Sequence, residues 1–361
     1  MQLDFHYYAT YCASFLAGFS HEDSLDIAYS CQFVDCCTRS YLSKIKGPQK
    51  AATTQTQSEL ANVRMDIVGL QDITRIWSSF HFLPYDLYAK VKGIKDYKNK
   101  FRLLCFPNGA LVSDTVQLAK GNGTQAYGIA MHVLADTWAH SGFCGTPSLV
   151  INNTNSYFFE ILPDGTSRKI SFKNSLSVPD DPDSGTYTGS LYQPFETSIM
   201  NLGHGRAGHL PDYSYARYEY LPSWGNYETR FKDNPSDYRH AFAQMIESLR
   251  YLGGNAQEFK LDTYAFDLLS LYEKDLSEII DTRRTDASDA WKAFGEKLSG
   301  CEIPDFDLDK YTQEYISSSN KSLTFMGRFI SAALAQKGMV TNRIFTSKNL
   351  LAGISVERRK A

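Results

Sequence analysis

Hydrophobic and polar residues follow a helical period over most of the chain. Apolar residues recur every three or four positions in residues 5–19, in residues 20–35 and in four segments between residues 237 and 338. Ser20 precedes the second of these segments, in the position of an N-cap. The pattern predicts a mainly α protein.

A shorter stretch has a different pattern of residues. SYFFEILPDGTSRKISF contains two runs of β-favouring residues on either side of Pro163-Asp164-Gly165, which is typical of a hairpin. An acidic, proline-rich segment follows it. We therefore expect one helical domain built from residues 1–145 and 195–361, with a β-containing insertion at residues 146–194.

The helical segment AYGIAMHVLADTWAHSG carries three polar residues at intervals of four, namely His132, Asp136 and His140. Four residues rotate an α-helix by about 400°, which is only about 40° more than a full turn, so the three side chains share a face. The two histidines lie about 12 Å apart along the axis, too far for one ion with bonds of about 2.0–2.1 Å. The spacing favours two metal ions bridged by Asp136. Buried side chains that are hydrogen-bonded to protein are the alternative.

Other histidines occupy settings that also suit metal ligands. His81 lies between two phenylalanines, where a neutral imidazole needs a partner for each ring nitrogen. In GHGRAGHLPD, His204, His209 and Asp212 fall close together among glycines. This second stretch is compatible with a metal-ligand set and equally with a hydrogen-bonded turn.

Composition narrows the classes of function. The chain has 361 residues, 43% of them hydrophobic, and 37 basic against 40 acidic residues give a net charge of −3. These values exclude dominant disorder and indicate no extended basic surface for nucleic acid. The seven cysteines show no CxxC spacing and are expected to be reduced thiols. With neither a basic leader nor an apolar run of transmembrane length, we expect a cytoplasmic protein or one exported without a signal peptide.

The order of the candidate ligands resembles that of a known superfamily. His6, Asp35, Phe80-His81-Phe82, His132-x3-Asp136, His140 and His204 follow one another as the ligands do in zinc-dependent phospholipases C and single-strand-specific zinc nucleases. HVLADTWAHS is similar to a helix of the het-C-type heterokaryon-incompatibility proteins. The opening DFHYY is similar to that of an uncharacterised bacterial family.

The resemblance implies a multi-helix phospholipase C/nuclease-like bundle, with two or three zinc ions and a small β-hairpin insertion. One zinc would be held by Asp35, His81, His132 and Asp136. A second would be held by His140 and His204 with His209 or Asp212, and a third by Asp136, His6 and the N-terminus. The chain departs from the family at Gly208, where the family has glutamate, and at Met1, where its enzymes have tryptophan.

The resemblance also implies hydrolysis of a phosphodiester by metal-activated water, with Asp35 as general base. The balanced charge favours a small phosphodiester or a lipid head group as substrate over single-stranded nucleic acid, which needs a basic groove with aromatic platforms. A single-strand nuclease is one alternative. A metal-stabilised interaction or effector module without turnover is the other.

Overall fold

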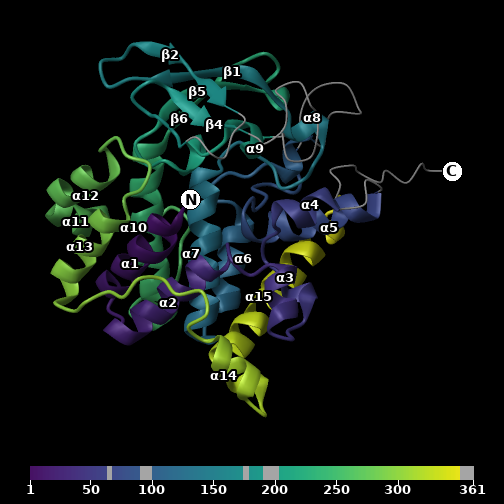
Figure 1. The fold of residues 1–361 in the computed structure, drawn as a ribbon, viewed down its shortest axis with the longest axis vertical. Coiled ribbons are helices and arrows are strands. Elements are labelled where there is room, and N and C mark those ends of the chain that lie inside the picture. The colour runs from purple at the N-terminus through teal and green to yellow at the C-terminus, as the bar shows by residue number, and fades with distance from the viewer. Residues whose placement is uncertain (63–66, 90–99, 174–178, 190–202, 350–361) are drawn as a thin grey trace.

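The computed structural model describes residues 1–62, 67–89, 100–173, 179–189 and 203–349, and these residues form a mainly α structure (Figure 1). The prediction of a mainly α protein is confirmed. Among the described helices, none combines the length and the apolar character needed to cross a membrane. The α-helices are α1 (Thr10–Leu16), α2 (His21–Phe33), α3 (Arg39–Lys44), α4 (Gln57–Ala61), α5 (Ile67–Phe80), α6 (Ala110–Ala119), α7 (Gly123–Ala139), α8 (Leu149–Asn152), α9 (His204–Ala207), α10 (Asn234–Gly253), α11 (Phe266–Leu269), α12 (Glu273–Ile280), α13 (Ser288–Ser299), α14 (Thr312–Ser317) and α15 (Phe325–Thr346).

Helix α7 runs through the middle of the molecule (Figure 1). Every residue from Gly128 to Ala139 is buried, and helices α2, α10, α15, α6 and α5 pack around it. A helix that is apolar on nearly all sides is stable only when other elements surround it. The segment singled out by its polar triplet is therefore the central helix of the core.

A glycine allows α7 and α2 to approach closely. A Cβ atom on Gly128 would lie 2.4 Å from the carbonyl oxygen of Ile27 and 2.7 Å from the amide nitrogen of Cys31. Only a residue without a side chain fits at that distance. The contact brings the last turn of α2 against the polar face of α7.

The N-terminal segment lies beside α7 (Figure 1). It begins with a single-turn π-helix, η1 (Asp4–Ala9), which continues into α1. The side chain of Ser20 accepts a hydrogen bond from the amide of Asp23, so the predicted N-cap of α2 is confirmed. π-Helical turns are rare and occur frequently at functional sites.

The β-strands are β1 (Thr154–Ile161), β2 (Ser167–Lys169), β3 (Ser171–Lys173), β4 (Thr186–Thr188), β5 (Arg217–Pro222) and β6 (Arg230–Asp233). Strands β1 and β2 form the predicted antiparallel hairpin, with Ile161 opposite Ser167. The main sheet has the order β2-β1-β5-β6 and lies over one end of the helical bundle (Figure 1).

The sheet extends beyond the expected insertion. Strands β5 and β6 follow residue 194, in a part of the chain that we expected to be helical, and β5 pairs with β1. The buried alternate residues of β5, such as Tyr218 and Tyr220, give it the two-residue period of a strand, which the helical reading overlooked. Residues 174–178 and 190–202, which include the expected boundary, lie outside the described residues.

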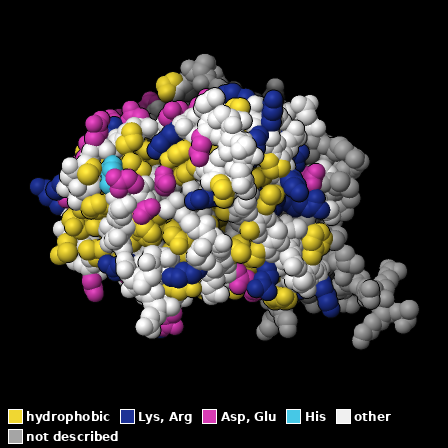
Figure 2. Space-filling model, turned by 90° about the horizontal axis from the view of Figure 1, so that it is seen from below, with side chains coloured by type: hydrophobic (Ala, Val, Ile, Leu, Met, Phe, Trp, Pro, Cys, Tyr) yellow, Lys and Arg dark blue, Asp and Glu magenta, His cyan; other side chains and the backbone are white. Residues whose placement is uncertain are grey.

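On the face seen in Figure 2, acidic, basic and hydrophobic side chains are intermixed. That distribution agrees with the near balance of 37 basic and 40 acidic residues.

Candidate metal centre

Eight of the nine candidate ligands come together around the C-terminal half of α7, and the α-amino group of Met1 joins them. The cluster is almost entirely buried, and Asp35 is its most exposed carboxylate, with 30% of the side chain accessible. Its members are His6, Asp35, His81, His132, Asp136, His140, His204 and Asp212.

Asp136 lies at the centre and uses its two oxygens differently. Oδ2 lies 3.2 Å from Nε2 of His132 and 3.3 Å from Nδ1 of His81. Oδ1 lies 3.2 Å from Nε2 of His6 and 3.1 Å from the amino nitrogen of Met1. The two oxygens of Asp136 thus face different groups, but His140, the second histidine expected to share an ion with Asp136, directs its Nε2 to Asp212.

The first group contains Asp35, His81 and His132, with Oδ2 of Asp136 beside them. Nε2 of His132 lies 3.3 Å from Nδ1 of His81, and Oδ1 of Asp35 lies 3.8 Å from the first of these nitrogens and 3.7 Å from the second. Tetrahedral bonds of about 2.0–2.1 Å place neighbouring ligand atoms about 3.3 Å apart. The spacing of the first group therefore suits one zinc-sized ion.

The second group contains His140, His204 and Asp212. Oδ1 of Asp212 lies 3.3 Å from Nε2 of His140, and Oδ2 lies 3.2 Å from Nε2 of His204. His140 forms the C-cap of α7, His204 begins α9, and Asp212 ends the short 3₁₀ turn η6 (Leu210–Asp212). The segment between the strands thus completes a site that begins on the central helix.

Backbone carbonyls fix the orientation of three histidine rings. Nδ1 of His132 donates to the Cys31 carbonyl at 3.0 Å, and Nε2 of His81 donates to the Thr53 carbonyl at 2.9 Å. Nδ1 of His140 donates to the His81 carbonyl at 2.7 Å. A carbonyl oxygen can only accept, so each of these nitrogens carries the ring hydrogen, and in a neutral ring the other nitrogen presents a lone pair. This arrangement is the usual one for histidines that bind metal.

The lone pairs therefore point at one another and at carboxylate oxygens. Nε2 of His132 and Nδ1 of His81 face each other without a hydrogen when both rings are neutral, and both face Asp136. Nε2 of His6 is buried and makes no hydrogen bond to any described residue, although Oδ1 of Asp136 is 3.2 Å away. Buried acceptors that face one another in this way need a cation or a shared proton between them. The residues present fit a metal.

Burial keeps three of the histidines neutral. It lowers the pKa of His6, His132 and His140 to about 4 in each case, in spite of the nearby Asp136 carboxylate. The pKa of His81 is raised instead, because hydrogen bonding to Asp136 and the charge of Asp35 outweigh the effect of its burial. Neutral imidazoles are the form that binds metal.

The buried carboxylates are held in their charged form. Burial alone would raise the pKa of Asp136, but the neighbouring His140 ring and the Met1 ammonium hold it well below its usual range. Burial would likewise raise the pKa of Asp212, and the Met1 ammonium and His204 lower it. In turn, the two carboxylates raise the pKa of the Met1 amine to about 11. The ammonium balances part of the negative charge that a metal would otherwise neutralise.

Asp35 follows the last turn of α2, where the sequence placed it. Burial, with the Asp136 carboxylate nearby, raises the pKa of Asp35, although His6 and His81 act in the opposite direction. The partly exposed side chain reaches both the first group and His6, with Oδ2 3.8 Å from Nε2 of His6. Asp35 is the carboxylate of the centre that is most open to solvent.

His209 does not join the cluster, and its inclusion among the ligands was wrong. Its Nδ1 lies 3.4 Å from Oδ2 of Asp180, and 52% of its side chain is exposed. The intervening residues form the tight turn η6, which directs Asp212 inward and leaves His209 at the turn's N-cap. Of the two alternatives for the second group, the structure brings in Asp212.

Two residues that hold the ligands were not identified from the sequence. Thr53 belongs to a polar segment that reads as a loop, yet it is fully buried and its carbonyl orients His81. Cys31 is also fully buried, and it contacts both His6 and His132. The carbonyl contacts to His81 and His132 are made by the backbone, which leaves no signal in the pattern of side chains.

Comparison with known proteins gives one match, to a family described as a family of unknown function (DUF6765), over residues 1–344. The chain belongs to this family. No curated protein and no solved structure matches it.

Proposed function

We propose that the chain is a zinc-dependent phosphodiester hydrolase of the phospholipase C type, with a helical bundle of that class. The observation that supports this proposal most is the convergence of histidine lone pairs on Asp136 and Asp212, two buried carboxylates. Hydrogen bonds within the protein leave Nε2 of His6 without a partner and, when both rings are neutral, set the lone pairs of His81 and His132 against each other, whereas divalent cations would satisfy these atoms.

The residues would divide among three ions. Asp35, His81, His132 and Asp136 would hold the first, and His140, His204 and Asp212 the second. Asp136, His6 and the Met1 amine would hold the third. A metal ion at the third position would displace a proton from the Met1 ammonium group. Binding at this position therefore depends on the protonation state of the amine.

The second group favours catalysis over a purely structural role. It supplies three side chains, and the Met1 amine lies 3.0 Å from Oδ1 of Asp212 and 3.4 Å from Nε2 of His140. As long as that amine stays protonated it binds no metal, and a tetrahedral ion with three protein ligands keeps one position for water or substrate. Divalent ions in such sites polarise a phosphoryl oxygen and lower the pKa of bound water to about 7. The first group holds His81, His132 and Asp136 deep in the core, and its remaining member, Asp35, is partly exposed.

Asp35 is our candidate for the general base. Its side chain is partly exposed, while Asp136 is 1% exposed. A general base must reach a water molecule, and Asp35 is the most exposed carboxylate of the centre, since the Asp212 side chain is 9% exposed. Its raised pKa brings it closer to the value at which a carboxylate exchanges protons efficiently.

A small phosphodiester or a lipid head group is the substrate we favour. The chain carries a net charge of −3, with 37 basic and 40 acidic residues. Single-stranded nucleic acid needs a basic groove to bind its backbone. The balanced charge supports the smaller substrate.

Metal content and hydrolysis, measured on the same preparation, test the proposal. The protein should contain two or three zinc ions per chain by mass spectrometry of the metal. It should hydrolyse bis(p-nitrophenyl) phosphate, lose that activity on treatment with a chelator and regain it when zinc is restored. His140→Ala should lose activity. His209→Ala, which alters a histidine outside the cluster, should keep it.

Bound metal without turnover would support the non-catalytic interaction module instead. In that case chelation should lower the thermal unfolding midpoint while no phosphodiester, including single-stranded DNA and short-chain phosphatidylcholine, is hydrolysed. Absence of bound metal would reject both functions.

A further inference from the structure

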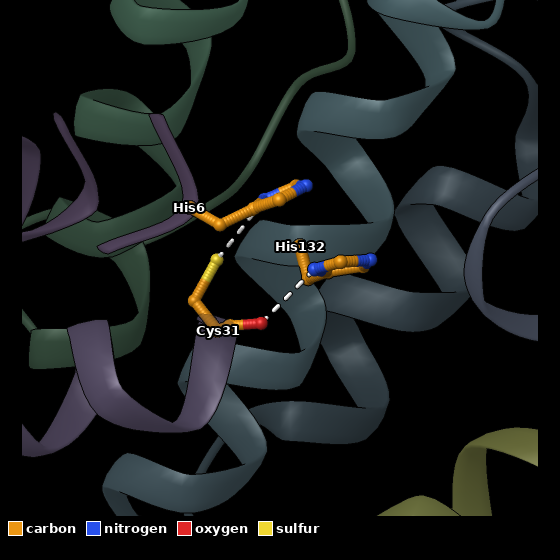
Figure 3. Close-up of side chains that lie close together, drawn as sticks. All are labelled: His6, Cys31 and His132. Carbon is orange, nitrogen blue, oxygen red and sulfur yellow. Dashed lines mark hydrogen bonds between the residues drawn. The ribbon is translucent and has the colours of Figure 1, made fainter. Parts of the chain in front are cut away.

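We propose that Cys31 is a positioning residue for two of the candidate metal ligands, holding His6 through its sulfur and His132 through its backbone carbonyl. The inference rests on the proposed metal centre but not on its catalytic activity. Figure 3 shows the three residues, with Cys31 in the last turn of α2 beside the two rings and in contact with each.

The carbonyl contact uses the C-terminal end of a helix. Cys31 lies in the last turn of α2, where carbonyl oxygens have no full set of helical partners and carry partial negative charge. Its oxygen accepts from the amide of Val34 at 3.3 Å and from Nδ1 of His132 at 3.0 Å. The contact leaves Nε2 of His132 as the metal-facing nitrogen.

The close approach at Gly128 makes this carbonyl contact possible. Gly128 is one helical turn before His132 on α7, and its missing side chain leaves room for the backbone of Cys31. The two helices therefore meet at the level of the ligand. His132 reaches the carbonyl without a shift of either helix.

The sulfur contact orients the second ring. Sγ of Cys31 lies 3.6 Å from Nδ1 of His6 and 3.3 Å from Oγ1 of Thr10, which donates to it. His6 and Cys31 are both fully buried, so no bulk water replaces the sulfur as a partner for Nδ1. When Nε2 of His6 binds a cation, Nδ1 carries the hydrogen and the sulfur is its acceptor.

The two rings are stacked, which couples their positions. The ring centroids of His6 and His132 are 3.9 Å apart, with an angle of 22° between the planes. Nε2 of each ring faces Asp136, one toward each carboxylate oxygen. Cys31 thus sets the direction of two imidazoles that serve the same bridging carboxylate.

Direct ligation by the thiol is the alternative role. His6, Cys31 and His132 each offer one ligand atom within 4.8 Å of the others. However, Nδ1 of His132 is already hydrogen-bonded to the Cys31 carbonyl, and its Nε2 points to Asp136. The nitrogens of His132 are therefore both engaged away from the sulfur, which favours positioning over ligation.

The test compares Cys31→Ala and Cys31→Ser with Cys12→Ala, using metal affinity from competition with a chelator. Cys12 is another fully buried cysteine, and its Sγ contacts the Trp291 carbonyl, away from the centre. Cys31→Ala should bind one ion about 10–100-fold more weakly, as expected for loss of a supporting hydrogen bond. Cys31→Ser keeps an acceptor and should recover most of the affinity, while Cys12→Ala should bind as the parent does.

Two spectroscopic readouts separate positioning from other roles. In the ¹⁵N spectrum of the zinc-bound parent, His6 should be protonated at Nδ1. In the cobalt-substituted proteins, any thiolate-to-cobalt charge-transfer band of the parent should persist in Cys31→Ala. Loss of such a band would identify Cys31 as a ligand and overturn the proposal.

Equal affinities for Cys31→Ala and Cys12→Ala would also overturn it, since Cys31 would then only fill space. If Cys31→Ala does not fold, Cys31→Ser and the protonation state of His6 decide the question. A parent that binds metal but hydrolyses no phosphodiester would reject the proposed function alone. A parent that binds no metal would reject both.

Discussion

Nε2 of His132 and Nδ1 of His81 lie 3.3 Å apart, and the opposite nitrogen of each ring donates to a backbone carbonyl. Two neutral imidazoles held in this way present lone pairs to each other. A proton or a metal ion must lie between them for the contact to be favourable. The predictions below depend on how the surrounding residues hold these rings and on which cation they share.

Asp136→Asn should remove two ions, because the two oxygens of Asp136 face different groups of ligands. His204→Ala should remove one, because His204 is one of the three side chains of the second group. The ions per chain can be counted by mass spectrometry on the folded fraction. His209→Ala is the matched control and should keep the full complement. Full metal content in Asp136→Asn would contradict the bridging role.

Acid should destabilise the metal-free protein. Burial lowers the pKa of His6, His132 and His140 to about 4, whereas an unfolded histidine has a pKa near 6.5. Between these values the unfolded chain binds protons that the folded chain does not, so the free energy of unfolding falls as the pH is lowered. The raised pKa of His81 offsets part of this effect.

Thermal unfolding of chelator-treated protein between pH 7.5 and 4.5 measures this dependence. The midpoint should fall steadily below pH 6.5, and His132→Asn, which has one buried ring fewer, should show a shallower slope. A midpoint that rises on acidification would show that these rings are charged in the folded protein.

Gly128→Ala should separate α7 from α2. The new Cβ would lie 2.4 Å from the Ile27 carbonyl oxygen, so the helices must shift, at a cost of about 1–3 kcal/mol. Urea unfolding gives the change in stability, and chelator competition should show weaker metal binding. Gly338→Ala is the control: it lies in α15 with no atom within 4 Å of its Cβ, and should be neutral or stabilising by up to about 1 kcal/mol.

Lys337→Met should loosen the segment that orients His81. Nζ of Lys337 donates to the carbonyls of Lys50 and Ala52, and the next carbonyl, that of Thr53, accepts from His81. We expect a loss of about 1–3 kcal/mol in the free energy of unfolding, together with weaker metal binding.

Lys44→Met is the matched control for this change. Lys44 forms an exposed ion pair with Asp309 at 3.4 Å, and such pairs contribute about 0–1 kcal/mol. Denaturant unfolding of both variants, with and without zinc, measures the difference. Equal effects of the two substitutions would show that the Lys337 contacts do not support His81.

The sequence by itself determined the helical architecture and most of the candidate ligands. The four-residue spacing of His132, Asp136 and His140 fixes their common face, because helix geometry converts spacing into direction. Local chemistry likewise placed the N-cap at Ser20 and the hairpin between β1 and β2. These features depend on residues that are close together in the chain.

Only the tertiary structure decided which distant residues meet. The choice of Asp212 over His209 depends on how η6 is oriented, and the sheet gained β5 and β6 from beyond the expected insertion. The roles of Cys31 and Thr53 depend on backbone carbonyls that reach rings far away in sequence. Every residue has such a carbonyl, so its position in space, and not its residue type, determines what it can hold.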